Sequence, residues 1–287
     1  MISIIIVDYL APEYTKRCIE SLNKTTYKDK EIILIDNSND NQGLAAAQNK
    51  GTRMARGNYY FFLNNDTLVK EDIFERLLES KTDVTGCRMF NYDGTKELDS
   101  GISVDKFGCP AGKTGPIFYP DGAIFIKADV FDEIGGFDEA LFLYGEDRDL
   151  AWRAWLGGFT VGVNNSAVFY HNSSCVDSVS FARRRISEKN IIRSMIKNYS
   201  LGYIGFILLE YSFWSILELG FIALTKPQAL WKSYFPAYWW NLLNINDTLA
   251  QRKNIVRRIP DSALPFSKKI GKFNTLLEKG FPVWKRS

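Results

Sequence analysis

Three short apolar runs in the first 66 residues place the strongest limit on the fold. Residues 2–7 (ISIIIV), 31–36 (EIILID) and 59–66 (YYFFLNND) have the β-branched and aromatic composition of buried strands. Stretches of helical character follow them, at residues 12–24, 43–55 and 70–80. The order βαβαβα predicts an α/β domain with a mostly parallel sheet, right-handed crossovers and flanking helices.

Polar side chains gather where each of these runs ends. Asp8 follows the first run, residues 36–38 (DNS) end the second, and residues 64–66 (NND) end the third. In open α/β sheets, ligands bind at the carboxyl ends of the strands. The sequence therefore predicts a binding site along this edge of the sheet.

The pattern changes after residue 83. Residues 83–127 favour short strands and turns, with a further strand at residues 121–127. Residues 128–158 contain two helical pieces, which the paired Gly135 and Gly136 separate.

Two short strands, at residues 159–163 and 167–171, are expected to close the first domain near residue 180. The sign of the charge changes at the same place. Residues 1–180 hold 18 Lys and Arg against 27 Asp and Glu, a net charge of −9, whereas residues 181–287 hold 18 against 6, a net charge of +12. Five of the seven tryptophans also lie in the second part. An acidic first domain and a basic, aromatic second domain indicate two different physical roles.

The most apolar stretch of the second domain is residues 201–225. Glu210 and Glu218 interrupt it, and the longest uncharged stretch between Lys197 and Glu210 is 12 residues. A membrane span needs about 20 predominantly apolar residues, so we expect interfacial or re-entrant helices instead. The aromatic and basic residues that follow favour peripheral docking on the anionic, cytoplasmic face of a membrane. A helical cap on the first domain is the alternative.

The four cysteines, at positions 18, 87, 109 and 175, form no Cys-x-x-Cys pair and have no zinc-like spacing. We expect free thiols in a reducing compartment. The first apolar run lacks a basic flank and a small-residue cleavage site, so it predicts a strand and not a signal peptide.

Several classes of enzyme are disfavoured by missing motifs. The sequence contains no G-x-G-x-x-G after the first strand, no P-loop and no G-x-S-x-G elbow. A single histidine excludes a zinc hydrolase with two or three histidine ligands.

Four segments together resemble the successive motifs of family 2 glycosyltransferases, which have the GT-A fold. They are ISIIIVDYL, EIILIDNSNDNQGLAAAQNKG, YYFFLNNDT and GGFDEALFLYGEDRDLAWRAWLGGFTVGVNNSAVFYHNSS, and they cover about residues 2–175 in order. The pattern is most similar to that of bacterial rhamnosyltransferases. The resemblance implies inverting transfer of a sugar, with rhamnose favoured, from a nucleotide-diphosphate sugar. It also implies a glycan or polyprenyl-diphosphate-linked acceptor in cell-surface polysaccharide synthesis, and a divalent cation, Mn²⁺ or Mg²⁺.

The same resemblance assigns a nucleotide-sugar site. Asp36 corresponds to the residue that accepts a hydrogen bond from the pyrimidine imide, and its alternative role is an Asx turn within DNSND. For Asn41, the alternative is a plain helix N-cap. The full set of expected nucleotide-sugar ligands is Val7, Asp8, Tyr9, Asp36, Asn41, Gly43, Asn49, Asn64, Asn65 and Asp66.

The expected cation ligands are Asp66 and His171. Residues 64–66 stand where the family usually has Asp-x-Asp, but the first acid is replaced by Asn64. Hard cations prefer carboxylate oxygen, so Asp66 is the expected ligand at this position and the affinity for metal is lowered. His171, the one histidine, ends the run AVFYH, where family members supply a further ligand.

Three acids lie in the segment FLYGEDRDLAW. By resemblance, Asp147 is the catalytic base, Glu146 supports it or binds acceptor, and Asp149 has a structural role. The alternative is that all three acids simply favour the positive end of a helix dipole.

The expected acceptor-binding residues are Gly122, Gly135, Gly136 and Trp152. For the glycine pair, the alternative is an ordinary helix stop. Trp152, together with Trp155, either stacks on a sugar ring or belongs to the core, and burial habits favour the core.

A second hypothesis stays open: a GT-A domain that has lost catalysis and serves as a binding partner in a glycan-assembly complex. Asn64 is the residue that keeps this hypothesis open. A nucleotidyltransferase is disfavoured, because its Gly-rich N-terminal loop and partner lysine are missing. We expect no nucleic acid partner, and a homodimer is left open.

Overall fold

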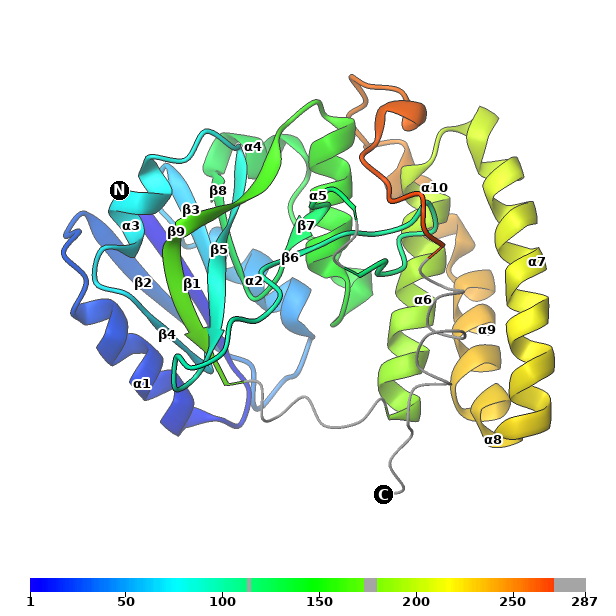
Figure 1. Ribbon diagram of the computed structural model, residues 1–287, viewed down its shortest axis with the longest axis horizontal. Coiled ribbons are helices and arrows are strands. Elements are labelled where there is room, and N and C mark those ends of the chain that lie inside the picture. The colour runs from blue at the N-terminus through cyan, green and yellow to red at the C-terminus, as the bar shows by residue number, and fades with distance from the viewer. Residues whose placement is uncertain (113–114, 173–179, 271–287) are drawn as a thin grey trace. The chain divides into compact units, whose positions relative to one another are not determined.

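The computed structural model describes residues 1–112, 115–172 and 180–270 (Figure 1). The chain divides into two compact units. The N-terminal unit comprises Met1–Ile102 and Ile117–Val176, and the helical unit comprises Ser103–Pro116 and Asp177–Ser287. The division differs from the expected one in one respect, because residues 103–116 group with the helical unit.

A seven-stranded mixed sheet forms the centre of the N-terminal unit, in the order β2-β1-β3-β8-β5-β9-β4. Its strands are β1 (Ile2–Asp8), β2 (Lys30–Asp36), β3 (Tyr59–Asn64), β4 (Thr67–Val69), β5 (Val84–Asn91), β8 (Ala123–Lys127) and β9 (Val161–His171). Strand β1 pairs in parallel with β2 and β3, and β5 pairs in parallel with β9. Strand β8 is antiparallel to β3 and β5, and β4 is antiparallel to β9. The expected α/β class with flanking helices is confirmed, but the sheet, which was expected to be mostly parallel, is mixed.

Helices cover both faces of this sheet. They are α1 (Pro12–Asn23), α2 (Leu44–Thr52), α3 (Ile73–Leu78), α4 (Ala128–Glu133) and α5 (Glu146–Leu156), with a 3-10 turn η1 (Glu139–Leu141). Ile4 and Ile6 of β1 lie in one cluster with residues of α1 and α3, whereas Ala47 of α2 packs with Ile33 and Ile35 of β2. A small second sheet pairs β6 (Gly101–Ile102) with β7 (Tyr119–Pro120).

The two short strands expected at residues 159–163 and 167–171 are in fact one strand, β9. Its register against β5 shifts between Cys87 and Arg88, so the polar residues of β9 near Asn164 form a bulge. The side-chain amide of Asn164 donates to the Arg76 carbonyl at 2.7 Å, so this polar group of the bulge has a hydrogen-bond partner. The polar residues of this segment suggested a break between two strands, because the hydrogen-bond partner of Asn164 lies 88 positions away in the sequence.

The helical unit contains α6 (Phe181–Asn198), α7 (Leu201–Thr225), α8 (Pro227–Ala229), a π-helical turn η3 (Leu230–Tyr234), α9 (Phe235–Leu243), α10 (Ile245–Arg252) and a 3-10 turn η4 (Asp261–Ala263). Residues 201–225 form one continuous helix of 25 residues, and not several short ones. By length and composition α7 could cross a membrane. Its Ile207, Tyr211, Glu218 and Ile222 are nevertheless buried within the helical unit.

Three cysteines, Cys18, Cys87 and Cys109, are free and buried. This agrees with the expectation of free thiols at these positions. Cys175 lies outside the described residues.

Candidate active site

The carboxyl ends of three neighbouring strands meet at one edge of the sheet. Asp8 at the end of β1 pairs with Asp36 at the end of β2, and Val7 pairs with Asn64 at the end of β3. The polar residues that the sequence placed after separate strands are therefore side by side. The candidate site is built on this edge.

Asp8 holds the edge together. Its Oδ1 accepts hydrogen bonds from the Ala11 amide at 3.2 Å, the Thr15 hydroxyl at 2.8 Å and the Asn65 amide at 3.0 Å. Asn65 also donates to the Thr15 hydroxyl at 2.9 Å. These contacts join the start of α1 to the end of β3, and the expected binding of nucleotide sugar by Asp8 and Asn65 stays a prediction. Tyr9, which follows Asp8, is half exposed.

Asp36 forms the Asx turn that was the alternative to nucleotide binding. Its Oδ1 accepts a hydrogen bond from the Ser38 amide at 2.9 Å. This hydrogen bond lowers the pKa of Asp36, so its carboxylate is fully ionised near neutral pH. Asp36 is nevertheless exposed. The turn and a ligand contact are thus compatible, because the turn fixes the side chain without burying it.

Asn41 shapes the loop that leads to α2 and is not an N-cap. Its Oδ1 accepts from the Gly43 amide at 3.0 Å and from the side chain of the buried Asn37 at 3.1 Å. The N-cap position of α2 belongs to Gly43, which has no side chain. The loop is therefore pinned by two asparagines before the helix begins.

Gly43 and Asn49 connect α2 to the loop before α5. Gly43 has φ +90°, and a Cβ there would lie 2.6 Å from the Phe142 carbonyl oxygen. That carbonyl accepts the first helical amide, from Leu44, at 2.7 Å. Asn49 donates to the Phe137 carbonyl at 2.9 Å and accepts the Phe137 amide at 3.0 Å. Both residues therefore position residues 137–142, and their expected contact with nucleotide stays a prediction.

Asp66 and His171 are brought together by the antiparallel pairing of β4 with β9. Their Oδ1 and Nε2 atoms are 3.4 Å apart, and the Asn64 amide lies 3.5 Å from the same Nε2. Burial raises the pKa of Asp66, and the His171 charge opposes this rise. Carboxylate oxygen, imidazole nitrogen and an amide suit a divalent cation such as Mn²⁺. Across the described ranges no group of three or more His, Cys, Asp and Glu side chains converges, so these residues fit a cation that takes its other ligands from substrate oxygens or water.

Two of the acids at the start of α5 share one buried environment. Glu146 is 8% exposed, and its Oε2 has no hydrogen-bond partner within the described part of the chain. Burial raises the pKa of Glu146 to about 7. Burial, together with the charges of Glu146 and Asp121, raises the pKa of Asp147 well above its ordinary value. Asp147 accepts a hydrogen bond from the Arg148 backbone amide at 2.6 Å.

Asp121 links this acidic group to the strand edge. It directly precedes Gly122, whose carbonyl accepts the backbone amide of Asn64 at the end of β3. The charge of Asp121 raises the pKa values of both Glu146 and Asp147, which places the three carboxyls in one electrostatic neighbourhood. Asp121 thus relates the start of α5 by charge, and the end of β3 through its neighbour Gly122, to the turn before β8.

Arg148 is a member of the site that sequence reasoning missed. It is 3% exposed, and its Nε and Nη2 atoms have no hydrogen-bond partner among the described residues. A Cβ on Gly145 would lie 2.5 Å from Nη2, so only glycine leaves room for the guanidinium. Its charge opposes the rise of the pKa values of Glu146 and Asp147. The signal was the arginine between Asp147 and Asp149 at the start of the helix.

Asp149 has the structural role that was expected. It is fully buried and accepts from Arg153 Nε at 2.9 Å, and Arg153 also donates to the Ile134 carbonyl. This ion pair ties α5 to the end of α4. The three acids therefore differ in environment, and a shared helix-dipole role does not describe them.

The expected acceptor residues are mostly structural. Trp152 is fully buried and packs edge-on against Phe118 at 5.9 Å. Its assignment to acceptor binding is wrong, and the core alternative is correct. The amides of Gly135 and Gly136 bond back to the Asp132 and Phe131 carbonyls at 3.0 Å, which is a Schellman stop for α4.

Gly122, the fourth expected acceptor residue, lies between the strand edge and the core. It has φ +75°, and a Cβ there would approach the Phe169 ring to 3.1 Å. Its backbone fits a sharp turn before β8 that a larger residue would strain.

Comparison with known proteins relates the N-terminal part of the chain to one family. The model of the family described as "Glycosyltransferase like family 2" matches residues 1–85. Glycosyltransferase GlyG of Streptococcus pneumoniae is 31% identical over 121 residues, which are 32% of this chain and 40% of that protein. The N-terminal part of this chain is thus similar to family 2 glycosyltransferases. The chain spans only 36% to 40% of the length of the first three curated relatives that it matches.

Solved structures agree with this family in fold. GalNAc-T7 with UDP, GalNAc and Mn²⁺ has a TM-score of 0.55 at 17% identity, covering 69% of this chain and 48% of that chain. The mannosyltransferase PcManGT of Pyrobaculum calidifontis, in complex with GDP-Man and Mn²⁺, has a TM-score of 0.52 at 14% identity, covering 89% of this chain and 84% of that chain. These likenesses show that the protein has the GT-A fold.

Proposed function

We propose that the protein is an inverting glycosyltransferase. It transfers a sugar from a nucleotide-diphosphate donor to a hydroxyl of a glycan or polyprenyl-diphosphate-linked acceptor, in the synthesis of cell-surface polysaccharide. The observation that carries this proposal is the juxtaposition at the strand edge. Asp66, which directly precedes β4, lies beside His171, which ends β9. The charge of Asp121 in the turn before β8 raises the pKa of Asp147 in α5.

Asp147 is the proposed base. It takes the proton of the acceptor hydroxyl as that oxygen attacks the anomeric carbon, and the bond from this carbon to the diphosphate oxygen breaks. A base works best when its pKa lies near the working pH, and burial beside Glu146 and Asp121 moves the pKa of Asp147 in that direction. Glu146 supports this shift by its own charge.

The donor side rests on Asp36 and on the Asp66–His171 pair. Asp36, exposed and ionised, can accept a hydrogen bond from the imide of a pyrimidine base. A divalent cation held by Asp66 and His171 would offset the charge on the departing diphosphate. The UDP, GDP-Man and Mn²⁺ named with the two solved structures support a nucleotide-sugar donor and manganese. Rhamnose is proposed as the sugar on the motif resemblance.

The test is sugar transfer by wild type and by an Asp147→Asn variant, with a panel of nucleotide sugars and manganese. Asp147→Asn should keep nucleotide affinity and lower turnover by about 10²–10⁴-fold, the usual share of general base catalysis. Asp129→Asn is the matched control. Asp129 also begins a helix and accepts the amide of the next residue, Val130, at 2.8 Å, so its loss should leave turnover unchanged.

Three outcomes separate the hypotheses. Near-normal transfer by Asp147→Asn would remove the base assignment and make Glu146 the next candidate. Loss of activity in both variants would indicate a helix-end effect on folding. Nucleotide binding by the wild type without any transfer would support the binding-partner hypothesis that Asn64 keeps open.

A further inference from the structure

The outward side of α7 is apolar along its whole length. Nine large hydrophobic side chains of this helix are exposed: Leu201, Tyr203, Phe206, Leu209, Phe213, Ile216, Leu217, Phe221 and Leu224. We call them the outer face of α7. Within α7, all of which the structure describes, no exposed side chain is charged. An apolar surface of this extent on a soluble unit marks an interaction site.

The two acids that interrupt the sequence of α7 do not reach this face. Glu210 forms an ion pair with Lys106 at 2.5 Å, within the helical unit. Glu218 is buried, pairs with Arg184 and accepts the Tyr234 hydroxyl at 2.7 Å. Their charges are therefore neutralised on the inner side. The helix presents an uninterrupted apolar outer face although its sequence is interrupted.

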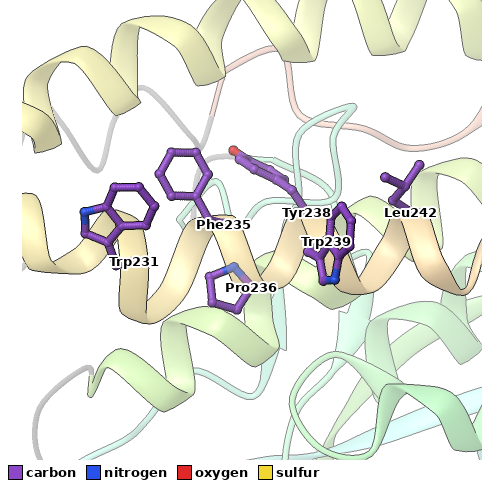
Figure 2. Close-up of a pocket in the computed structure, with 6 residues that line it drawn as sticks. All are labelled: Trp231, Phe235, Pro236, Tyr238, Trp239 and Leu242. Carbon is purple, nitrogen blue, oxygen red and sulfur yellow. The ribbon is translucent and has the colours of Figure 1, made fainter.

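A second apolar surface lies along α9 and the turn before it. Figure 2 shows six side chains that line a shallow groove: Trp231, Phe235, Pro236, Tyr238, Trp239 and Leu242. Trp231 and Trp239 are among the most exposed of them. Tryptophan prefers the boundary between headgroups and acyl chains, where one end of the ring stays polar. We call these residues the α9 groove.

The charge of the helical unit indicates the occupant of these surfaces. All five acids of residues 181–270 lie in ion pairs: Glu188, Glu210, Glu218, Asp247 and Asp261. Basic side chains in excess remain exposed, at Arg185, Lys232, Lys253, Arg258, Lys268 and Lys269. Residues 181–287 carry +12, which favours an anionic surface and opposes close approach of a second copy.

We infer that the outer face of α7 and the α9 groove dock the helical unit on a bilayer that contains anionic lipid. The apolar side chains enter the boundary of the acyl chains, and the cations face the headgroups. The helix does not cross the bilayer, because Tyr211 and Glu218 on its inner face are packed against α6 and η3. This inference is independent of the proposed catalytic activity.

The test is flotation of the full-length protein with vesicles of phosphatidylcholine alone and of phosphatidylcholine mixed with phosphatidylglycerol. Wild type should float with the anionic vesicles at low salt, and less so at high salt, where screening is stronger. The double variant Phe213→Glu/Ile216→Glu places charges at outer-face positions that are 57% and 67% exposed. It should lower the bound fraction by about tenfold or more.

Met54→Glu is the matched control, since Met54 is 57% exposed in the N-terminal unit. It should bind vesicles like the wild type. Far-UV circular dichroism of each variant checks that the fold is kept. We expect it to be kept, because the substituted positions are exposed. The inference is overturned if the wild type does not bind anionic vesicles at low salt, or if the double variant binds them as well as the wild type does.

Two further outcomes identify other occupants. A dimer in sedimentation that the double variant abolishes, with vesicle binding unaffected, would assign the outer face to a second copy. Protein that stays with vesicles after an alkaline carbonate wash would show that α7 spans the bilayer, because a peripheral protein is released by that wash.

Discussion

Replacing Glu146 by glutamine should make the N-terminal unit more stable at alkaline pH. Glu146 is buried with an unpartnered Oε2 among the described residues, and burial raises its pKa from 4.5 to about 7. Folding therefore holds this carboxyl in a place that disfavours its charge. Glutamine has nearly the same shape and carries no charge at any pH, so the variant avoids the free-energy cost of burying a charge.

The size and sign follow from linkage. The folded state keeps the proton at pH values where the unfolded state has lost it, so the wild type loses stability as pH rises from about 4.5 to about 7. Each pKa unit is worth about 1.4 kcal/mol, which gives a full cost of about 3 kcal/mol above that window. The cost is about 1.4 kcal/mol at about pH 5.5. The stability difference between variant and wild type should thus grow by about 2 kcal/mol between about pH 5.5 and about pH 8.5.

The assay is urea unfolding at these two pH values, followed by hydrogen exchange of peptides from α5. Such peptides report on the N-terminal unit by itself. A buried amide without hydrogen-bond partners would cost about 1–3 kcal/mol of stability. That cost does not depend on pH, so it does not change how much the stability difference between variant and wild type grows with pH. Asp149→Asn is the contrasting variant. It leaves the buried Arg153 charge without its ion-pair partner and should destabilise the unit by about 3–5 kcal/mol. A Glu146→Gln difference that stays constant with pH would refute the reasoning.

Three other predictions concern the strand edge. Asp66→Ala and His171→Ala, which remove the two atoms 3.4 Å apart, should each raise the manganese concentration that transfer requires; activity resistant to chelator would show that the site works without a cation. Asp36→Ala should weaken donor nucleotide by about 1.5–3 kcal/mol, the worth of one hydrogen bond to a charged group, while melting temperature stays near that of wild type; an unchanged dissociation constant in calorimetry would reject the role. Gly43→Ala should lower the melting temperature markedly, because its Cβ would clash with the Phe142 backbone; a stability equal to wild type would mean that the loop shifts freely.

The strand edge could be predicted from the sequence because its signals are local. Each apolar run is followed at once by its polar residues, so Asp8, Asp36 and Asp66 were placed correctly without any knowledge of contacts. The Asp66–His171 pair was also found, but through motif resemblance, since the two residues are 105 positions apart. The contacts of Asn49 and Gly43 within the chain were not predicted, because they lie 88 or more positions away and no short pattern reports them.

Burial was the second quantity that the sequence did not reveal. Arg148 looks like a solvated charge in EDRDLAW, but the structure buries it with two nitrogens unpartnered among the described residues. Glu210 and Glu218 looked like interruptions of an apolar helix, but both turn toward cations. In each case the direction of a side chain decides its role, and direction depends on packing between segments distant in sequence.

The segment 103–116 has a practical consequence for dissecting this protein. It lies between β6 and β7 in the chain, yet it folds with the helical unit. There Phe107 is fully buried and packs on Tyr211 at 5.5 Å, and the Lys106 carbonyl accepts the Tyr199 hydroxyl. A chain cut near residue 180 would keep this segment and lose every one of those partners. Its exposed phenylalanine alone forfeits about 1.5–3 kcal/mol of burial. The isolated N-terminal unit should therefore tend to aggregate unless residues 103–116 are replaced by a short polar linker.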